Sequence, residues 1–396
     1  MGAGDLYYDP YDVEIDADPY PVYRRLRDEA PVYYNERLDF WGLSRHEDVI
    51  TALRDHKRLT STKGDILEVV KAEPYIPPGV FINEDPPLHT IHRALVSRMF
   101  RPKRIKAIED KVRAFCAACL DPLVGQDRFD FVLDLGAELP MRTIGMLLGI
   151  PDSEQPSLRS TAQRALRNKP GKPLPVTKEK YFDGGNFAEY VEWRARHPGD
   201  DIITELLNLE FTDLSGKERR LTRQEVQIFV GVIGSAGVET TGRLFGWMGK
   251  VLAEHPDQRR ELVEDPSLIP RAVEELLRYE PPAPHAARYV TEDVEYHGQT
   301  IPAGSALLLM LASANRDERQ FPDPDRFDIH RDLSQIVTFG HGAHFCLGAG
   351  LARLEGRIAL EEVLKRFPTW EVDLAAARRA PTSTVRGWDS MPVVVG

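Results

Sequence analysis

The stretch TFGHGAHFCLGAGLARLEG, residues 338–356, places one of the chain's three cysteines in a glycine-rich turn directly before a helical pattern. Gly340 and Gly342 permit backbone conformations and close approaches that a side chain would forbid, and Gly348 and Gly350 leave one face of the following helix bare. Cys346 therefore lies near a helix N-terminus, where the dipole and the free N–H groups favour thiolate over thiol. The stretch predicts a thiolate beside a flat, glycine-lined surface.

Composition and cysteine usage exclude several classes of protein. Three cysteines in 396 residues, and no basic and then apolar leader at MGAGDLYYDP, favour a reducing cytoplasm over secretion. The net charge of -11 argues against nucleic-acid binding, because phosphate contacts need a basic surface. The longest apolar run, SALLLMLASA, is too short to span a bilayer, so we expect no membrane partner.

The other two cysteines do not predict a metal site. Cys116 and Cys119 have a spacing that suits zinc, but no second thiol pair and no close histidine pair follows them. They lie in an amphipathic helical pattern, so we interpret them as small core residues one helical turn apart.

The chain is predicted to be mostly helical and to form one domain over residues 1–396. No Ser/Gly-rich linker, internal repeat or low-complexity block divides it, and RNKPGKPLPVTKEK, residues 167–180, is interpreted as a mobile loop between helices. Strand-like pieces are short and lie near the ends. PVYYNERLDFWGL and YHGQTIPAG predict two hairpins, and WDSMPVVV predicts a terminal strand.

The longest helical pattern, LTRQEVQIFVGVIGSAGVETTGRLFGWMGKVLAEHP, predicts a helix of about thirty residues. Thr222 and Glu225 form a capping box at its start, and Pro256 ends the pattern. Its middle is apolar on nearly every face, so we expect it to be central and buried.

This helix contains an anomaly in its middle. Gly231, Gly234 and Gly237 each cost about 1 kcal/mol relative to alanine in a helix interior, so something must approach the backbone closely. An acid and two hydroxyls follow at 239–241, and a threonine there can bond the carbonyl of Ala236 and open the helix. From this segment alone, close helix packing and a functional groove stay equal alternatives.

A thiolate loop opposite a glycine groove indicates an axial ligand to haem iron. FGHGAHFCLG matches every fixed position of Phe-Gly-x-Gly-x-His-x-Cys-x-Gly, so it resembles the haem-binding loop of the cytochrome P450 family. In family order, NEDPPLHTIHRALVSRMFRP resembles a haem-facing helix, AGVETT the oxygen-binding groove, EELLRYEPP the Glu-x-x-Arg pair and FPDPDRFDIHRD the stretch that docks an arginine on it. The resemblance implies a mainly α fold, a helical bundle around haem with small β-sheets near the termini.

The resemblance implies haem b, iron-protoporphyrin IX, as the cofactor. Cys346 becomes the proximal thiolate ligand, with Phe339 packed beside the sulfur. Propionates near haem need cationic donors, and the residues that match are His344, His89, Arg93 and Arg288. Further haem contacts are expected at Gly340, Gly348, Ala236 and Gly237. His92 falls near the face that His89 and Arg93 share, but we interpret it as a packing residue.

Glu275 and Arg278 receive two different interpretations. Helical periodicity places them with other charged residues, away from the apolar positions, which predicts a solvated face. The resemblance instead implies that Glu275 and Arg278 are buried behind the haem in a network with Arg326. Such a network is costly unless it is complete, so the loss of one member should be severe.

The ligand set implies the chemistry. A thiolate ligand favours cleavage of the O–O bond, so one oxygen atom of dioxygen enters an organic substrate by hydroxylation or epoxidation. The resemblance gives Thr240 a hydrogen bond to the reacting oxygen and makes Glu239 the connection to solvent. Fatty-acid peroxygenase relatives carry an arginine in place of this pair, so the pair favours a monooxygenase that receives electrons from a reductase.

Separate proteins are expected to supply these electrons, because the chain has no Gly-rich dinucleotide fingerprint and no cysteine cluster for an iron–sulfur centre. A ferredoxin with its NAD(P)H-dependent ferredoxin reductase is the expected donor. Arg101, Lys103, Arg104 and Lys106 offer a basic patch for an acidic ferredoxin. A merely solvated charged face stays open as the alternative.

Residues of the substrate pocket are expected on several segments: Phe81, Ile233, Ala236, His285 and Val385. Most are apolar or small, which fits a small to medium, largely apolar substrate. Two other functions stay open: a haem-thiolate sensor or electron carrier, which needs Cys346 but not Thr240, and a hydrolase that uses Cys346 with His344 as base. The glycine groove opposite the thiolate loop favours the monooxygenase over both.

Overall fold

The structure is a computed structural model that describes residues 6–155, 167–176 and 187–396. Helices dominate it, which confirms the mostly helical prediction. The α-helices are α1 (Val13–Ala17), α2 (Tyr20–Glu29), α3 (His46–Arg54), α4 (Leu67–Ala72), α5 (Leu88–Ser97), α6 (Pro102–Ala107), α7 (Glu109–Leu120), α8 (Leu139–Leu148), α10 (Ala188–Arg196), α11 (Ile202–Asn208), α12 (Arg223–Glu254), α13 (Pro256–Glu264), α14 (Ile269–Tyr279), α15 (Leu311–Ala314) and α16 (Ala349–Arg366).

The strands are short and form small sheets. They are β1 (Val32–Asn35), β2 (Phe40–Leu43), β3 (Leu59–Thr60), β4 (Arg128–Asp130), β5 (Glu210–Thr212), β6 (Glu218–Arg220), β7 (Ala286–Val290), β8 (Val294–Tyr296), β9 (Gln299–Ile301), β10 (Ala306–Leu309), β11 (Trp370–Val372), β12 (Arg378–Arg379), β13 (Trp388–Ser390) and β14 (Pro392–Val395). The largest sheet has the order β1-β2-β10-β7-β3, in which β10 is parallel to β2 and antiparallel to β7. A second sheet has the order β11-β14-β4.

The strand predictions are confirmed for both hairpins and wrong in part for the C-terminal piece. β1 pairs with β2 and β8 pairs with β9, both antiparallel. WDSMPVVV is not one strand, because β13 pairs with β12 whereas β14 pairs with β11 and β4. The change of sheet occurs at Met391, whose N–H donates to the side-chain carboxylate of Asp130 at 2.9 Å instead of to a backbone carbonyl.

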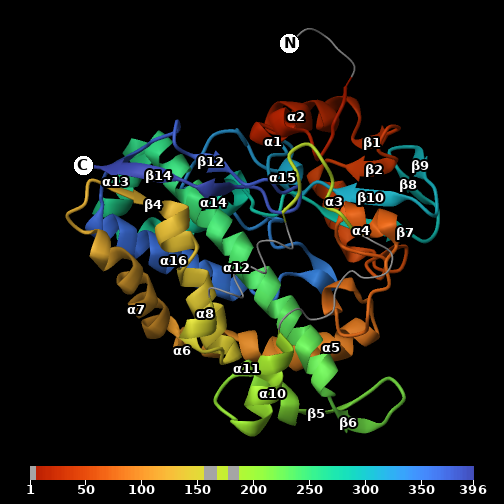
Figure 1. Cartoon of the computed structure of the whole chain (residues 1–396). Helices are drawn as coiled ribbons and strands as arrows, with labels where there is room; N and C mark the ends of the chain where they lie inside the picture. The colour runs from red at the N-terminus through yellow and green to blue at the C-terminus, as the bar shows by residue number, and fades with distance from the viewer. Residues whose placement is uncertain (1–5, 156–166, 177–186) are drawn as a thin grey trace.

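Helix α12 runs obliquely across the middle of the molecule (Figure 1). Its start is as predicted: Thr222 is the N-cap, and the capping box with Glu225 is complete. Packing explains some of its glycines, because a Cβ at Gly237 would lie 2.8 Å from Ile144 of α8. At Gly242 a Cβ would lie 2.8 Å from the carbonyl oxygen of Gly136, in the π-helical turn η4 (Phe131–Gly136). Here the backbones of α12 and η4 touch.

Helices α8, α14 and α16 pack on α12, and α7 packs on α8 and α16; all share one large apolar core. Cys116 is buried in this core and Cys119 is partly buried against it, one turn apart on α7, as predicted. No cluster of three or more metal-ligating side chains occurs among the described residues. Within the described ranges no helix has the length and apolar character needed to cross a membrane. The loop predicted over 167–180 is free of helix and strand over 167–176, and its remainder lies outside the described residues.

Candidate active site

The cysteine turn folds back on itself before α16 begins. The N–H of Cys346 donates to the carbonyl of Phe339 at 2.8 Å, and Gly340 and Gly342 have φ values of 70° and 72°, which favour glycine. The residue Cys346 is exposed, and no heavy atom lies within 4 Å of a Cβ built at Gly348. The turn therefore presents its sulfur to open space at the start of α16, as the sequence predicts.

The electrostatics around this thiol differ from the simple helix-dipole expectation. Although the residue is exposed to the open space, the surrounding protein mass raises the pKa of the Cys346 thiol above its ordinary value. The N–H of Gly348 and the guanidinium groups of Arg93 and Arg353 lower it without reversing the shift. The helix N-terminus alone does not ionise this sulfur, whereas a coordinated metal cation would deprotonate it.

Four basic side chains gather beside the cysteine turn. The imidazole rings of His89 and His344 lie 4.4 Å apart, and both buried Nε2 atoms lack a hydrogen-bond partner within the described part of the chain. Burial, together with the charges of His344 and Arg93, lowers the pKa of His89 to about 4. Arg93 donates to the carbonyl of Phe345 at 2.5 Å. Burial, together with the charge of buried Arg288, lowers the pKa of His344.

The sequence-based prediction did not include one carboxylate of this cluster. Asp85 is a hydrogen-bond acceptor for Thr60 and lies 3.8 Å from Nε2 of His344. It stands four residues before His89, a spacing that could have indicated it. His92 instead bonds Glu84 at 2.8 Å in a buried pair.

The buried helix α12 has an open turn in its middle. Ala236 is exposed and Gly237 and Thr240 are partly exposed, whereas Ile233 and Val238 are buried. The Thr240 hydroxyl donates to the carbonyl of Ala236 at 3.0 Å, as predicted. Its oxygen keeps its acceptor capacity for another partner. The bare side of Gly237 faces α8, which supports close helix packing at this glycine, whereas a functional groove at Ala236 and Thr240 stays a prediction.

Glu239 does not share the open turn. It is buried, and its Oε2 accepts from Nη2 of Arg243 at 2.9 Å. Arg243 also donates to Asp389 on β13 at 3.0 Å, and Asp389 pairs with Arg167 at 2.8 Å. Sequence reasoning missed Arg243, although its i,i+4 spacing from Glu239 is the usual spacing for helical ion pairs.

The interpretation of Glu275 and Arg278 as a solvated face is wrong, and the buried network is present. Both side chains are 0% exposed and form a bidentate pair at 2.6 and 2.7 Å. The expected third member, Arg326, is exposed and contributes only its carbonyl, which accepts from Arg278 at 3.3 Å. The guanidinium that reaches Glu275 belongs to Arg331, at 3.3 Å, because the chain turns back at 326–331 and brings that side chain inward.

The expected pocket residues lie on α12 and on several segments outside it. Phe81, on the short helix η1 (Phe81–Asn83), stacks against Phe229 with ring centroids 5.5 Å apart. His285 and Val385 are buried, and burial lowers the pKa of His285 to about 4. The Nδ1 atom of His285 has no partner among the described residues. Whether these residues contact one substrate stays a prediction.

The residues fit a haem group. Cys346 supplies an exposed thiol as a metal ligand, and no neighbour fills the space beside Gly348. Two imidazoles without hydrogen bonds at Nε2 and two arginines supply donors for two carboxylates. Fold and site together define the class of haem-thiolate oxygenases.

Comparisons with known proteins agree. Residues 188–381 match the family described as Cytochrome P450. The chain is 39% identical over 401 residues to cytochrome P450 123 of Mycobacterium tuberculosis, covering 100% of this chain and 98% of that protein. It is 36% identical over 385 residues to the vitamin D(3) 25-hydroxylase of Pseudonocardia autotrophica, covering 96% and 94%. A solved mutant of P450 EryK in complex with erythromycin B aligns with a TM-score of 0.85 at 32% identity, covering 96% and 97%.

The chain therefore belongs to the cytochrome P450 family. It has the family's fold and haem b as its cofactor, and it is a P450 monooxygenase, an oxidoreductase that acts on a small molecule with dioxygen. This membership decides against a hydrolase that uses Cys346 without haem, and it favours monooxygenation over a sensor or carrier.

Proposed function

We propose that this chain is a single-domain, cytoplasmic monooxygenase that inserts one oxygen atom into a largely apolar organic substrate, with electrons from a separate ferredoxin system. The observation that carries the proposal is the exposed thiol of Cys346 before α16, in a fold whose central helix α12 has an open turn at Ala236 and Thr240. When bound through a thiolate, haem iron supplies the activation of dioxygen.

The basic cluster would hold the carboxylate edge of haem. His89 and Arg93 lie on α5, Arg288 on β7 and His344 in the cysteine turn, so the site forms only when these three distant segments have packed together. The buried Nε2 atoms of the two imidazoles have no hydrogen-bond partner among the described residues, although Asp85 lies 3.8 Å from that of His344. Propionate oxygens would satisfy them, and leaving buried donors unpaired is costly.

Substrate binding is proposed above α12, between Phe81, Ile233, His285 and Val385. Apolar side chains predominate, and the orphaned Nδ1 of buried His285 offers one polar contact. Sterol-like and macrolide compounds are the first to test, since relatives include a vitamin D(3) 25-hydroxylase and a P450 solved with erythromycin B. Titration of the haem-loaded protein with each compound, read as a spin-state shift, tests this; a true substrate should also drive oxygen consumption, which a sensor would not show.

Thr240→Ala should uncouple reduction from oxygen insertion. The Thr240 oxygen faces the open turn with free acceptor capacity, so it can position a protonated oxygen or water there. Without it, haem and substrate should bind normally and NAD(P)H consumption should continue, while product per NAD(P)H falls and hydrogen peroxide rises. Thr241→Ala, one position along the same helix and buried, is the matched control. Unchanged coupling in Thr240→Ala would assign Thr240 only to its hydrogen bond with Ala236.

Glu239→Gln should instead slow turnover without a comparable loss of coupling. Glu239 is buried and would move protons toward the site, so the amide restricts their supply rather than their destination. We expect a decrease of about 10- to 100-fold in kcat, with little change in the spin-state titration. Equal turnover for wild type and Glu239→Gln would remove this residue from proton delivery.

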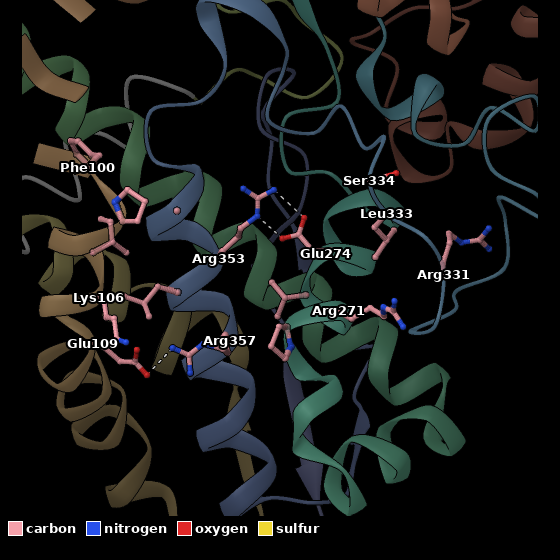
Figure 2. Close-up of a pocket in the computed structure, with 16 residues that line it drawn as sticks. Phe100, Lys106, Glu109, Arg271, Glu274, Arg331, Leu333, Ser334, Arg353 and Arg357 are labelled. Carbon is pink, nitrogen blue, oxygen red and sulfur yellow. Dashed lines mark hydrogen bonds and ion pairs between the residues drawn. The ribbon is translucent and has the colours of Figure 1, made fainter. Parts of the chain in front are cut away.

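A cleft on the cysteine side of α16 is the proposed docking surface for ferredoxin. Its volume is about 630 Å³, and five cations but only two carboxylates line it, although the chain carries a net charge of -11. Figure 2 shows Arg353 and Arg357 of α16 in its centre, paired with Glu274 at 2.5 Å and Glu109 at 2.7 Å. The Arg353 guanidinium also stacks on Phe339, 4.5 Å from the ring centroid, and so connects the cleft to the cysteine turn.

The predicted basic patch contributes only in part to this cleft. Lys106 lines it, and Arg101 and Lys103 are exposed nearby on α6 or directly before it. Arg104 instead pairs with Glu205 of α11 at 2.7 Å. Across the cleft, Arg271 adds a cation that the sequence reasoning did not include.

Reversing two of these charges should impair electron transfer. Lys106 and Arg271 form no ion pair with a described residue, so Lys106→Glu/Arg271→Glu should leave the fold intact. We expect association with a bacterial [2Fe–2S] ferredoxin to slow by about tenfold or more at low salt, with a flatter salt dependence. Stopped-flow reduction of the haem measures this. Lys217→Glu/Lys365→Glu makes the same change in net charge elsewhere, and an equal loss in both variants would contradict docking at the cleft.

A further inference from the structure

Four charged groups of alternating sign connect the 167–176 segment to the central helix. Arg167 pairs with Oδ2 of Asp389 at 2.8 Å, Oδ1 of Asp389 accepts from Arg243 at 3.0 Å, and Arg243 donates to Glu239 at 2.9 Å. Arg243, Asp389 and Glu239 are at most 16% exposed, whereas Arg167 is 41% exposed. This series of ion pairs thus leads from the buried Glu239 to Arg167, whose side chain reaches the surface.

The Arg243 guanidinium is shared between two carboxylates on different elements. Its Nη2 binds Glu239 on α12, and its Nη1 binds both Asp389 and the carbonyl of Trp388 on β13. Its Nε has no hydrogen-bond partner among the described residues. Glu239 and Asp389 therefore compete for one buried cation, and any group that compensates Asp389 strengthens the hold of Arg243 on Glu239.

Arg167 is the group that compensates Asp389. The segment that carries it is also attached by its backbone, because the N–H of Asn168 donates to the carbonyl of Pro381 at 3.0 Å. Farther along, the N–H of Leu174 donates to Glu68 at 3.2 Å, and Glu68 also accepts from Ser383 at 2.8 Å. The segment therefore rests on the 381–389 stretch that carries Asp389.

We propose that Arg243 is a positioning residue for Glu239 and that Asp389 and Arg167 couple its position to the attachment of the 167–176 segment. While Arg167 holds Asp389, Arg243 stays with Glu239 and fixes the buried carboxylate. When the segment lifts, Asp389 loses its second cation and draws Arg243 toward β13, which releases Glu239. The proton-delivery consequence rests on the role proposed above for Glu239, but the coupling itself does not.

Coupling between two sites is reciprocal, so a change at Glu239 must alter the attachment of the segment. In Glu239→Gln, Arg243 belongs to Asp389 alone, and Asp389 should hold Arg167 less. In Arg243→Gln, Asp389 keeps only Arg167 and should hold it more. The two variants therefore move the segment in opposite directions, whereas general structural damage would loosen it in both.

Hydrogen–deuterium exchange of the haem-loaded enzyme, followed by mass spectrometry on peptides that contain Asn168 and Leu174, measures this. We expect exchange to be several-fold faster in Glu239→Gln and Asp389→Asn and slower in Arg243→Gln, with Arg243→Lys close to wild type. Glu254→Gln removes another i,i+4 pair of α12, with Lys250, and should change nothing at this segment. Unchanged exchange in Glu239→Gln, or faster exchange in Arg243→Gln, would overturn the proposal.

A second measurement separates this proposal from the function proposed for Glu239. In Arg167→Gln, Glu239 should be released more readily, so kcat should rise or its solvent isotope effect should fall, with the change in kcat and not only in KM. If Glu239→Gln turns over normally yet alters exchange, the coupling stands and the proton role fails. If Glu239→Gln is slow but exchange is unaltered and Arg167→Gln leaves kcat and its isotope effect unchanged, the proton role stands and the coupling fails.

Discussion

Cys346→Ser should abolish the thiolate-type carbonyl spectrum and all monooxygenation. Cys346 is the exposed cysteine directly before α16, and a serine hydroxyl ionises too weakly to replace a thiolate ligand. Cys346→His offers a nitrogen ligand instead, so we expect haem to be retained but the red-shifted carbonyl band to be lost. Difference spectra of the reduced carbonyl complexes, together with product formation, measure both effects.

Cys119→Ser is the matched control for this test. It removes a thiol that is only partly buried on α7, and we expect its spectrum and activity to equal those of wild type. If Cys346→Ser kept both the thiolate spectrum and activity, the ligand assignment would be wrong, and with it the proposed arrangement of the site.

Arg278→Ala should prevent the protein from retaining haem. Arg278 is 0% exposed, and besides its pair with Glu275 it donates to the carbonyls of Asn315 and Pro324 at 2.9 and 2.8 Å. Its loss leaves the buried Glu275 carboxylate with the backbone N–H of Asp328 at 3.0 Å and Arg331 at 3.3 Å, and it orphans two carbonyls. We expect a cost of about 3–5 kcal/mol in unfolding free energy. Haem content per chain and denaturant unfolding measure it.

Alanine variants of the two neighbouring arginines test which of them belongs to the buried network. Arg326→Ala should be near neutral, because the Arg326 side chain is exposed and alanine keeps the carbonyl that accepts from Arg278. Arg331→Ala should lie between Arg326→Ala and Arg278→Ala, since Arg331 makes the longer contact with Glu275. Equal losses in Arg326→Ala and Arg331→Ala would restore Arg326 as the third member of the network.

Local patterns were enough for most of the fold, because they encode local energetics. The capping box at Thr222 and the two hairpins depend on neighbouring residues, and each forms where predicted. The C-terminal strand was mispredicted because the change of partner at Met391 depends on Asp130, which is far away in sequence. Periodicity also failed at Glu275 and Arg278, because a helix pattern cannot show that a charged face meets buried carbonyls from another segment.

Prediction of the site residues has the same limit: local features could be predicted, and contacts between distant segments could not. The cysteine turn and the hydrogen bond from Thr240 to Ala236 are local and could be predicted from sequence. Arg353 and Asp389 act through contacts across the fold, and no spacing in the chain points to them. Motifs thus locate the chemistry, whereas the groups that tune it become visible only when distant segments are packed together.

The largest sheet also determines when the molecule can assemble during synthesis. Strands β2 and β10 are parallel neighbours, yet most of the chain separates them, and β7 and β3 likewise join distant parts. Such pairings carry a high loop-closure cost and form slowly. On the ribosome, β1 and β2 must therefore wait with an unpaired edge until β10 emerges, and the cysteine turn emerges later still. For much of translation the nascent chain exposes unpaired, aggregation-prone strand edges. The yield of folded protein in a cell should therefore depend on chaperones and on the haem supply when the chain leaves the ribosome.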